Sequence, residues 1–324
     1  GELGRGGMGR VLHARDGRLG REVALKELRA GRSARRLARE ARITARLDHP
    51  GIVPVYDAGV GPDGTPFYTM GLVRGRSLAD VLSDADGPGP RLMLLRRVLE
   101  AAQAVGYAHS QGVVHRDLKP ANIMLGGYGE TRVVDWGLAT LGDESSPGRR
   151  PAGPETLAPG VTAEGAVLGT PTYMSPEQAA GDRGDARSDV WSLGIILYEL
   201  VAGAPPFHGA DSEAVLRRLR SEPPPPLEGP RELCAIVERA LCRAPAGRYP
   251  DAGALATDLS SYMDGHEVGA YDYTPWELLI RLVLAWRVPL GVAAVAAVIL
   301  AGTGAVLGAR IADQRDRAVD AEKQ

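Results

Sequence analysis

The sequence predicts an α+β fold in which a small β-rich lobe, residues 1–72, precedes a larger and mainly helical lobe, residues 73–264. Three observations indicate this order. The first region has glycine turns and short alternating apolar runs, which are typical of strands. The second region has apolar residues at helical spacing. An uncharged stretch, residues 288–309, then predicts a single transmembrane helix.

Composition and charge fit a globular protein with two lobes. Of the 324 residues, 44% are hydrophobic and 24% are charged, proportions that exclude a disordered or collagen-like chain. The formal net charge of −2 gives no overall attraction to nucleic acid, so no nucleic-acid partner is expected. Two cysteines, Cys234 and Cys242, are too few for a disulfide framework.

The β-rich lobe combines strand patterns with one helix. A glycine turn at 4–9 leads into a strand, and the alternation over 22–26 predicts a second, half-buried strand. Residues 33–47 are predicted to form a helix. Its many arginines lack interleaved aromatic residues, which favours a solvated helix face over a nucleic-acid surface. The strand expected at the very start of the chain is truncated before Leu3.

The mainly helical lobe alternates helices with short strands. Amphipathic or apolar patterns predict helices over 92–109 and 187–201. Short apolar pieces predict strands at 113–114, 123–125 and 133–134. A stretch rich in Gly, Pro, Ser and Glu, residues 142–165, indicates a long loop.

The transmembrane helix is predicted from 22 uncharged residues, 288–309, between Arg287 and Arg310. At about 1.5 Å per residue this helix extends about 33 Å, enough for the ~30 Å hydrocarbon core. A buried helix of a soluble protein is the alternative. Residues 265–287 are then a juxtamembrane segment, and residues 310–324 begin an extracytoplasmic region. Because the chain starts without Met and ends in a charged run, we expect it to be a piece of a longer protein.

Lysine usage points to phosphate binding. Of the 38 basic residues, 35 are Arg and only three are Lys: Lys26, Lys119 and Lys323. A compact ammonium approaches a phosphate where a guanidinium fork does not fit, so two lysines inside the chain indicate positions that Arg cannot fill. Coding bias and chance are the alternatives, and the neighbouring residues decide between them.

The first of these lysines follows a glycine-rich turn. The turn reads Gly4-x-Gly6-x-x-Gly9-x-Val11. Its backbone can approach a polyphosphate because glycine has no side chain. The motif alone also fits a dinucleotide-binding fingerprint or a plain turn, but here a strand rather than a helix follows. Glu40 comes 14 residues after Lys26 and is placed to pair with it, the alternative being a surface pair with Arg36.

A second group of polar residues is more specific. It reads His115-Arg116-Asp117-Leu118-Lys119-Pro120-Ala121-Asn122, followed by Asp135-Trp136-Gly137. Asp117 supplies a carboxylate for a substrate hydroxyl, and Lys119 supplies an ammonium for a transferring phosphate. The oxygens of Asn122 and Asp135 suit Mg²⁺, which prefers oxygen ligands and phosphates. Both internal lysines therefore lie in phosphate-binding motifs, which makes chance a poor explanation.

Over residues 1–264 this ordered set of motifs resembles a eukaryotic-like (Hanks-type) serine/threonine protein kinase of the bacterial, membrane-anchored kind. The resemblance implies a bilobal protein kinase fold and transfer of the γ-phosphoryl group of ATP, with Mg²⁺, to Ser or Thr of protein substrates. It implies catalytic roles for Asp117, Lys119, Lys26 and Glu40, and metal ligation by Asn122 and Asp135. The residues implied to contact ATP are Leu3, Gly4, Gly6, Gly9, Val11, Ala24, Lys26, Met70, Leu72, Val73 and Met124.

The resemblance also covers the frame of the larger lobe. It implies that Arg248 pairs with Glu177, in Ser-Pro-Glu where Ala-Pro-Glu is usual, and that Asp189 braces the catalytic loop. Three positions depart from the family pattern without removing a chemical group: Trp136 after the metal-binding aspartate, Gly71 in the hinge and Thr44 after Glu40.

Two other functions stay open on the sequence alone. A pseudokinase or scaffold would bind nucleotide and partners without turnover, and a small-molecule kinase would phosphorylate a metabolite. Orientation in the membrane is also contested, since two basic residues lie near the span on its N-terminal side and four on its C-terminal side. Because ATP is cytoplasmic, we place the kinase lobes in the cytoplasm, anchored to the cell membrane by a single span.

The segment from Asp135 to Glu177 is 43 residues long and predicts regulation by phosphorylation, carried out by a second, self-associating copy. Arg116 is suited to bind a phosphate on this segment. Thr162 is the favoured acceptor, whereas Thr170 resembles the residue that contacts the catalytic groups. The alternative is an insertion without a regulatory role.

Overall fold

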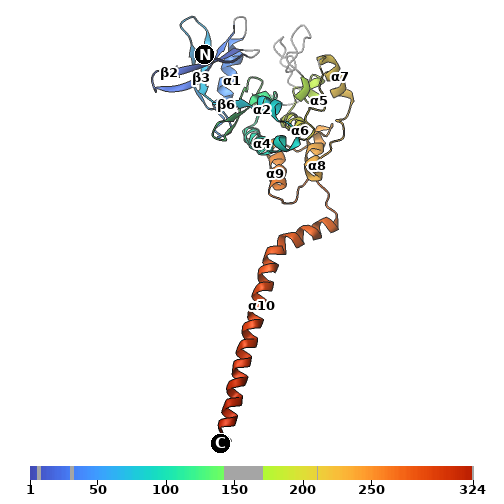
Figure 1. Cartoon of the computed structure of the whole chain (residues 1–324). Coiled ribbons are helices and arrows are strands. Elements are labelled where there is room, and N and C mark those ends of the chain that lie inside the picture. Colours follow the sequence, from blue (N-terminus) through green and yellow to red (C-terminus); the bar gives the residue numbers. More distant parts are fainter. Residues whose placement is uncertain (6–8, 30–32, 142–170, 210, 323–324) are drawn as a thin grey trace. The chain divides into compact units, whose positions relative to one another are not determined.

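The computed structural model forms one compact unit from Gly1–Tyr271 and a second from Asp272–Gln324 (Figure 1). The residues it describes are 1–5, 9–29, 33–141, 171–209 and 211–322. The first unit contains a β-rich lobe followed by a mainly helical lobe, so the predicted fold class is confirmed.

The N-terminal lobe is built on an antiparallel sheet. Its strands are β1 (Glu2–Arg5), β2 (Gly9–Asp16), β3 (Arg21–Leu28), β4 (Val55–Val60) and β5 (Pro66–Gly71), in the spatial order β1-β2-β3-β5-β4. The strand predicted over 22–26 is part of β3. Its pairing with β5 places Lys26 opposite Tyr68 and Ala24 opposite Met70. This register brings the predicted lysine to the middle of the sheet.

Helix α1 (Ala34–Thr44) lies within the predicted range of 33–47. Its buried side consists of Leu37, Glu40, Ala41, Ile43 and Thr44. The arginines of its other side are exposed, as predicted for a solvated face: Arg35, Arg36, Arg39, Arg42 and, after the helix, Arg46. Its N-cap residue, Ser33, makes no side-chain capping hydrogen bond to the described residues, and no acidic residue occupies the first turn. The stability of α1 therefore depends on the contacts of its buried side.

The C-terminal lobe contains the predicted helices and short strands. Its helices are α2 (Leu78–Asp84), α3 (Pro88–Leu92), α4 (Leu95–Ser110), α5 (Pro176–Ala179), α6 (Ala186–Ala202), α7 (Ser212–Ser221), α8 (Arg231–Ala240) and α9 (Ala252–Met263). Its strands are β6 (Gly75–Ser77), β7 (Val113–Val114), β8 (Ile123–Gly126), β9 (Thr131–Val133) and β10 (Thr140–Leu141). Single 3₁₀ turns occupy Pro120–Asn122, Pro171–Tyr173 and Pro245–Gly247. The strands form two small sheets, β6-β8-β9 and β7-β10.

Helix α6 forms the centre of this lobe. Every residue from Ser188 to Tyr198 is buried, which explains the nearly continuous apolar pattern. The helix ends at Gly203, whose φ of 87° is a left-handed conformation that suits glycine. Helices α4 and α9 also approach closely, because a Cβ at Gly106 would lie 2.7 Å from the Cα of Gly253. The core of the lobe thus rests on helix packing around α6.

The chain beyond α9 folds back onto that helix. The backbone N–H of Gly269 donates to Asp258 Oδ1 at 3.0 Å. Val268 is buried, with 3% of its surface exposed. The first compact unit accordingly ends at Tyr271, whereas the sequence pattern predicts the end of the lobe at residue 264.

The second unit is dominated by helix α10 (Pro275–Glu322), which has 48 residues. Within it, Gly291–Ile311 is long and apolar enough to cross a membrane. This stretch overlaps the predicted span of 288–309. Over the part of the chain that the structure describes, it is the one helix that meets these criteria.

Candidate active site

Three predicted residues meet at the junction of the two lobes. Lys26 Nζ, from β3, donates to Glu40 Oε1 of α1 at 2.6 Å and to Asp135 Oδ1 at 2.9 Å. Lys26 and Glu40 side chains are 8% and 0% exposed, whereas Asp135, at 42%, is open to solvent. One ammonium is therefore shared by a buried carboxylate of the N-terminal lobe and an exposed carboxylate that lies 109 residues away in the chain.

The cluster contains one ammonium and two carboxylates, and this excess of negative charge influences the pKa of each group. Burial lowers the pKa of Lys26, but the two carboxylates outweigh burial and raise it. Burial raises the pKa of Glu40, and Lys26 offsets this only in part. Partial desolvation by the surrounding protein would raise the pKa of Asp135, but Lys26 beside it outweighs this and holds the pKa below normal. Lys26 and Asp135 thus favour their charged forms, while Glu40 carries the cost of desolvation.

Asp189, near the start of α6, holds the backbone at the start of residues 115–122, the loop that the family resemblance implies is the catalytic loop. Its Oδ2 accepts the N–H of His115 and its Oδ1 the N–H of Arg116, both at 2.8 Å. His109 Nε2 lies 2.9 Å from Asp189 Oδ2, and His109 Nδ1 accepts the N–H of Ala252 at 3.1 Å. Nε2 of His109 therefore carries the proton and donates to Asp189. Burial raises the pKa of Asp189, but these donors outweigh it and lower the value.

Two residues of the site have left-handed backbone conformations, with φ of 69° at Arg116 and 64° at Asp135. Non-glycine residues adopt this region at a cost, which the surroundings must cover. For Arg116 they do so through Asp189 on its N–H and through Gln178 Nε2, which donates to its carbonyl at 3.0 Å. The fixed backbone at Arg116 determines where the next residue, Asp117, points.

Lys119 and Asn122 converge on Asp117. Lys119 Nζ donates to Asp117 Oδ2 at 2.7 Å, and Asn122 Nδ2 donates to the Asp117 carbonyl at 2.7 Å. The side chains of Asp117 and Lys119 are 35% and 38% exposed. The structure therefore brings the predicted carboxylate and ammonium together at a surface that a substrate can reach.

Asn122 and Asp135 fit the proposed Mg²⁺ ligands in chemistry. Because the nitrogen of Asn122 is used on Asp117, its side-chain oxygen is the atom left to face a cation. The N–H of Val134 donates to the Asn122 carbonyl at 2.9 Å, which ties Asn122 to the segment that carries Asp135. Among the described residues, no cluster of three or more His, Cys, Asp or Glu can hold a metal ion. A cation here would need phosphate and water oxygens as well, which is how Mg²⁺ is usually bound with nucleotides.

His115 links the catalytic loop to this segment. Its Nδ1 accepts the N–H of Asp117 at 3.3 Å, and its Nε2 lies 3.2 Å from the Val134 carbonyl. Its ring also packs against Trp136, with ring centroids 4.6 Å apart. Trp136, which replaces the usual Phe, is 2% exposed and fills the space behind the site. The departure from the family pattern therefore alters packing and leaves Asp135 in place.

The predicted nucleotide-contacting residues lie on the strands and hinge around this cluster. Ala24 is buried, whereas Val11, Met70 and Met124 are half-buried. Leu72 and Val73, also half-buried, connect β5 to β6. Leu3 and Gly4 lie on the exposed strand β1.

The glycines of the turn differ in their surroundings. A Cβ at Gly9 would collide with the carbonyl oxygen of Glu27, so the β2–β3 pairing itself requires glycine there. At Gly4 no atom of the described residues lies within 4 Å of such a Cβ. Gly6 lies outside the described residues, as do Thr162 and Thr170.

The predicted pair of Glu177 and Arg248 frames the far end of the site. Arg248 Nη1 and Nη2 donate to Glu177 Oε1 and Oε2 at 2.8 and 2.9 Å. Ser188 Oγ also donates to Glu177 Oε1, at 2.7 Å. This bidentate pair fixes the segment that leads into α5 against the start of α6.

Sequence reasoning missed three residues that support the site. His109 and Gln178 position the catalytic loop, and Tyr68 donates a hydrogen bond to Glu40. None of the three had a local sequence signal; Tyr68 lies opposite Lys26 because of the register between β3 and β5.

Comparison with known proteins gives the same class of protein as the geometry. The protein kinase domain family matches residues 1–257. The chain therefore belongs to the protein kinase family.

Its relatives place it among the bacterial serine/threonine kinases, as the motifs predicted. It is 41% identical over 286 residues to the probable serine/threonine-protein kinase SCO3848 of Streptomyces coelicolor, covering 83% of this chain and 40% of that protein. It is 41% identical over 273 residues to PknB of Mycobacterium leprae, covering 79% and 41%. It is 40% identical over 270 residues to the DNA damage-responsive kinase RqkA of Deinococcus radiodurans, covering 79% and 38%. The chain thus spans about two-fifths of the length of these relatives.

Proposed function

We propose that the protein transfers the γ-phosphoryl group of ATP to serine or threonine hydroxyls of protein substrates. The observation that carries the proposal is the convergence of two groups of residues: Lys26 between Glu40 and Asp135, and Lys119 against Asp117. Phosphoryl transfer requires positioning and charge neutralisation more than covalent chemistry, and these residues supply both.

Each residue of the site has a defined task in this reaction. Asp117 Oδ2 orients the substrate hydroxyl and accepts its proton as the bond to phosphorus forms. Lys119 Nζ, 2.7 Å from the same oxygen, neutralises negative charge on the group in transfer. Lys26, directed by Glu40, holds the phosphates of the bound nucleotide. Mg²⁺ held by Asn122 and Asp135 would neutralise phosphate charge.

Phosphate incorporation from radiolabelled ATP into a protein substrate tests this function. The full chain in detergent, with Mg²⁺, is expected to label Ser and Thr residues, and Asp117→Asn is expected to abolish the labelling. Nucleotide binding without incorporation would instead identify a pseudokinase. Label confined to small molecules would identify a metabolite kinase.

We infer further that Gly291–Ile311 anchors the chain in the cell membrane as a single span, with the kinase unit in the cytoplasm. The length and apolar composition of this stretch support the anchor, and the need for cytoplasmic ATP supports the orientation. Protease added to intact cells is expected to spare the kinase unit. Digestion of that unit from outside would reverse the orientation.

We propose, finally, that a second copy activates the kinase by phosphorylating the segment that contains Thr162. Arg116 precedes the proposed catalytic residue Asp117. Its Nη2 donates to the Gly184 carbonyl at 3.0 Å, so the guanidinium lies beside the loop between α5 and α6. Mass spectrometry of the active protein, with Thr162→Ala and Arg116→Ala variants, tests this regulation. Full activity with an unphosphorylated segment would contradict it.

A further inference from the structure

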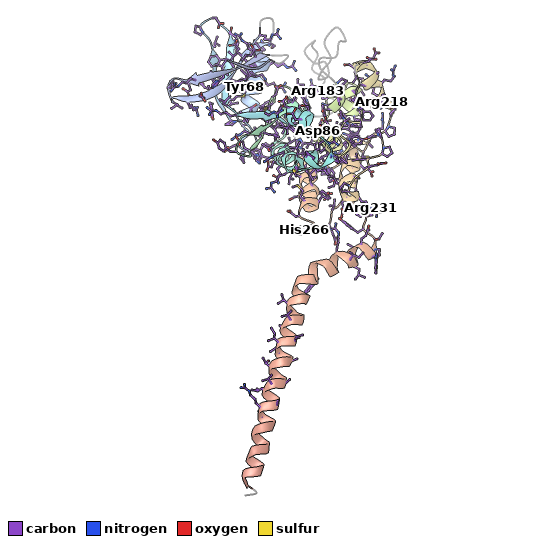
Figure 2. All side chains as sticks on the ribbon, in the orientation of Figure 1. Tyr68, Asp86, Arg183, Arg218, Arg231 and His266 are labelled. Atoms are coloured by element: carbon purple, nitrogen blue, oxygen red, sulfur yellow. The ribbon has the colours of Figure 1, made fainter. Side chains whose placement is uncertain are left out.

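Tyr68 is a buried titratable residue to which the proposed reaction assigns no task. It lies on β5 in the N-terminal lobe (Figure 2) and is 3% exposed. Its hydroxyl donates to Glu40 Oε1 at 2.7 Å. The same oxygen accepts Lys26 Nζ at 2.6 Å, so two donors from neighbouring strands converge on one carboxylate oxygen of α1.

We propose that Tyr68 is a positioning residue for the phosphoryl-transfer reaction, because its hydroxyl holds Glu40 against Lys26. Among the described residues, the second oxygen of Glu40, Oε2, has no hydrogen-bond partner. The carboxylate is therefore held through Oε1 alone. Lys26 cannot supply the whole restraint, because its ammonium also bonds to Asp135 Oδ1 at 2.9 Å. Tyr68 is the donor on Glu40 that has no such competing carboxylate.

Tyr68 also connects this hydrogen bond to the packing of α1. Its ring forms a small apolar cluster with Leu37 and Ala41 of the helix. This cluster is separate from the larger core, to which Ile43 at the other end of α1 belongs. Ring and hydroxyl thus bind the same helix at two points, one apolar and one polar. Because α1 has no side-chain N-cap and no acidic first turn, these contacts matter more to its position than they would for a self-sufficient helix.

The consequence for the reaction concerns the direction of Lys26. A lysine side chain has many rotamers, and it orients phosphates well only when its ammonium is held in one place. Tyr68 fixes Glu40, Glu40 fixes Lys26, and Lys26 meets the nucleotide. The inference therefore rests on the proposed roles of Lys26 and Glu40. It adds Tyr68 as the residue that holds the carboxylate of Glu40 in position against Lys26.

Tyr68→Phe in the full chain tests the proposal, because it removes one hydroxyl and keeps the ring. Losing a hydrogen bond to a charged group is expected to lower kcat roughly ten- to hundredfold. The KM for a protein substrate should stay within about twofold, since Tyr68 lies away from Asp117 and Lys119. Tyr249→Phe is the matched control. Tyr249 is 2% exposed and donates to Asp258 at 2.8 Å in the C-terminal lobe.

A double-mutant cycle separates positioning through Glu40 from a general effect on the fold. In a Glu40→Met background, measured by single-turnover phosphoryl transfer, Tyr68→Phe is expected to lower the rate less than twofold. Should Glu40→Met not yield folded protein, Glu40→Gln serves as background, where the effect should shrink at least threefold. An undiminished effect in the folded background, or an equal loss in Tyr249→Phe, would overturn the proposal.

Lys26→Met distinguishes failure of this inference from failure of the proposed function. Loss of turnover in Lys26→Met together with an undiminished effect of Tyr68→Phe in the cycle would reject only the role of Tyr68. Normal turnover in Lys26→Met would reject the phosphate-binding role of Lys26 on which the inference about Tyr68 rests, whereas absence of protein labelling by the wild-type chain would reject the proposed function.

Discussion

Glu40 in the N-terminal lobe and Glu177 in the C-terminal lobe each form a buried ion pair, but the two pairs are completed differently. All five N–H groups of Arg248 are used, two on Glu177 and the others on the carbonyls of Cys242, Arg187 and Arg243. Both oxygens of Glu177 accept hydrogen bonds from Arg248. In contrast, Glu40 Oε2 has no partner among the described residues, and Lys26 divides its ammonium between two carboxylates.

We infer that the two pairs have different roles: the Glu177–Arg248 pair is structural, whereas the Lys26–Glu40 pair belongs to the proposed reaction site. A fully bonded guanidinium stacked over Trp191, 4.9 Å from its ring centre, has no capacity left for a ligand. Asp135, which shares the ammonium of the buried Lys26, is 42% exposed and forms the open side of the cluster. In the proposed reaction, Lys26 and Asp135 can therefore exchange their mutual contact for contacts with phosphates and a cation. The Glu177–Arg248 pair has no free N–H group and instead stabilises the C-terminal lobe.

The largest effect is expected for Lys26→Arg and Asp135→Asn, which should each lower phosphoryl transfer by at least about a hundredfold. A guanidinium in the narrow space between Glu40 and Asp135 cannot take the place of the compact ammonium, and an amide at residue 135 is a poorer cation ligand. The labelling assay, with circular dichroism to confirm folding, measures both.

Near-normal turnover in Lys26→Arg would contradict this prediction. It would show that the Lys26–Glu40 pair, like the Arg248–Glu177 pair, can be formed by an arginine without loss of phosphoryl transfer. Arg10→Lys is a matched control, since Arg10 is an exposed β2 residue that pairs with Glu27. It should leave turnover within about twofold.

Arg248→Met should lower the free energy of unfolding and should not act on the phosphoryl-transfer step directly. Among the described residues, it leaves the half-buried Glu177 with only Ser188 as a side-chain donor. Removing one partner of a buried ion pair typically costs about 3–5 kcal/mol of unfolding free energy, and the partly exposed carboxylate places this loss at about the lower end of that range. Chemical denaturation of the solubilised chain measures the loss. Glu40→Gln should cost less, because Glu40 already lacks one partner. A smaller loss for Arg248→Met than for Glu40→Gln would reverse our interpretation of the two pairs.

Both pairs could be predicted because each belongs to a motif with fixed order and spacing. Lys26, Asp117 and Arg248 were located by residue type within such motifs. Tyr68 and Gln178 were not, because their partners are 28 and 62 residues away and a tyrosine or glutamine alone gives no direction. Register is what places Tyr68 opposite Lys26, and register comes from strand pairing that local sequence patterns do not specify.

The extent of the folded unit was also beyond sequence reasoning. Val268 and Gly269 look like ordinary linker residues, but Val268 is buried in the large core and Gly269 donates a hydrogen bond to Asp258 of α9, so both belong to the first unit. Conversely, the two lobes and the approximate ranges of the elements predicted at 22–26, 33–47, 113–114, 123–125 and 187–201 followed from apolar periodicity, which is a local property.

The two glutamates should respond to pH with opposite signs. The pKa of Glu40 is raised above 4.5, chiefly by burial, so the folded state holds more protons and stability falls as pH rises above about 4.5. Burial also raises the pKa of Glu177, but Arg248 and Ser188 outweigh it and lower the value below 4.5. Its contribution is present above about pH 4.5 and is lost as pH falls below that value.

Denaturation of wild type, Glu40→Gln and Glu177→Gln between about pH 3.5 and about pH 7 measures both slopes. The stability advantage of wild type over Glu177→Gln should shrink toward acid, whereas the stability of wild type relative to Glu40→Gln should fall as pH rises toward about 7. Equal signs for the two variants would show that both carboxylates are stabilised in their charged forms.

The smallest effect is expected at Thr44, the polar residue in a position that is usually apolar. Its Oγ1 donates to the Glu40 carbonyl at 2.9 Å, and it is 6% exposed. That bond runs from residue i to i−4 within α1, where the carbonyl already has a helical partner. Thr44→Val keeps the branched shape, so unfolding free energy should change by less than about 1 kcal/mol and kcat by less than about twofold. A tenfold change in kcat would mean that the backbone of Glu40, and not only its side chain, is held in place by the residues that follow it.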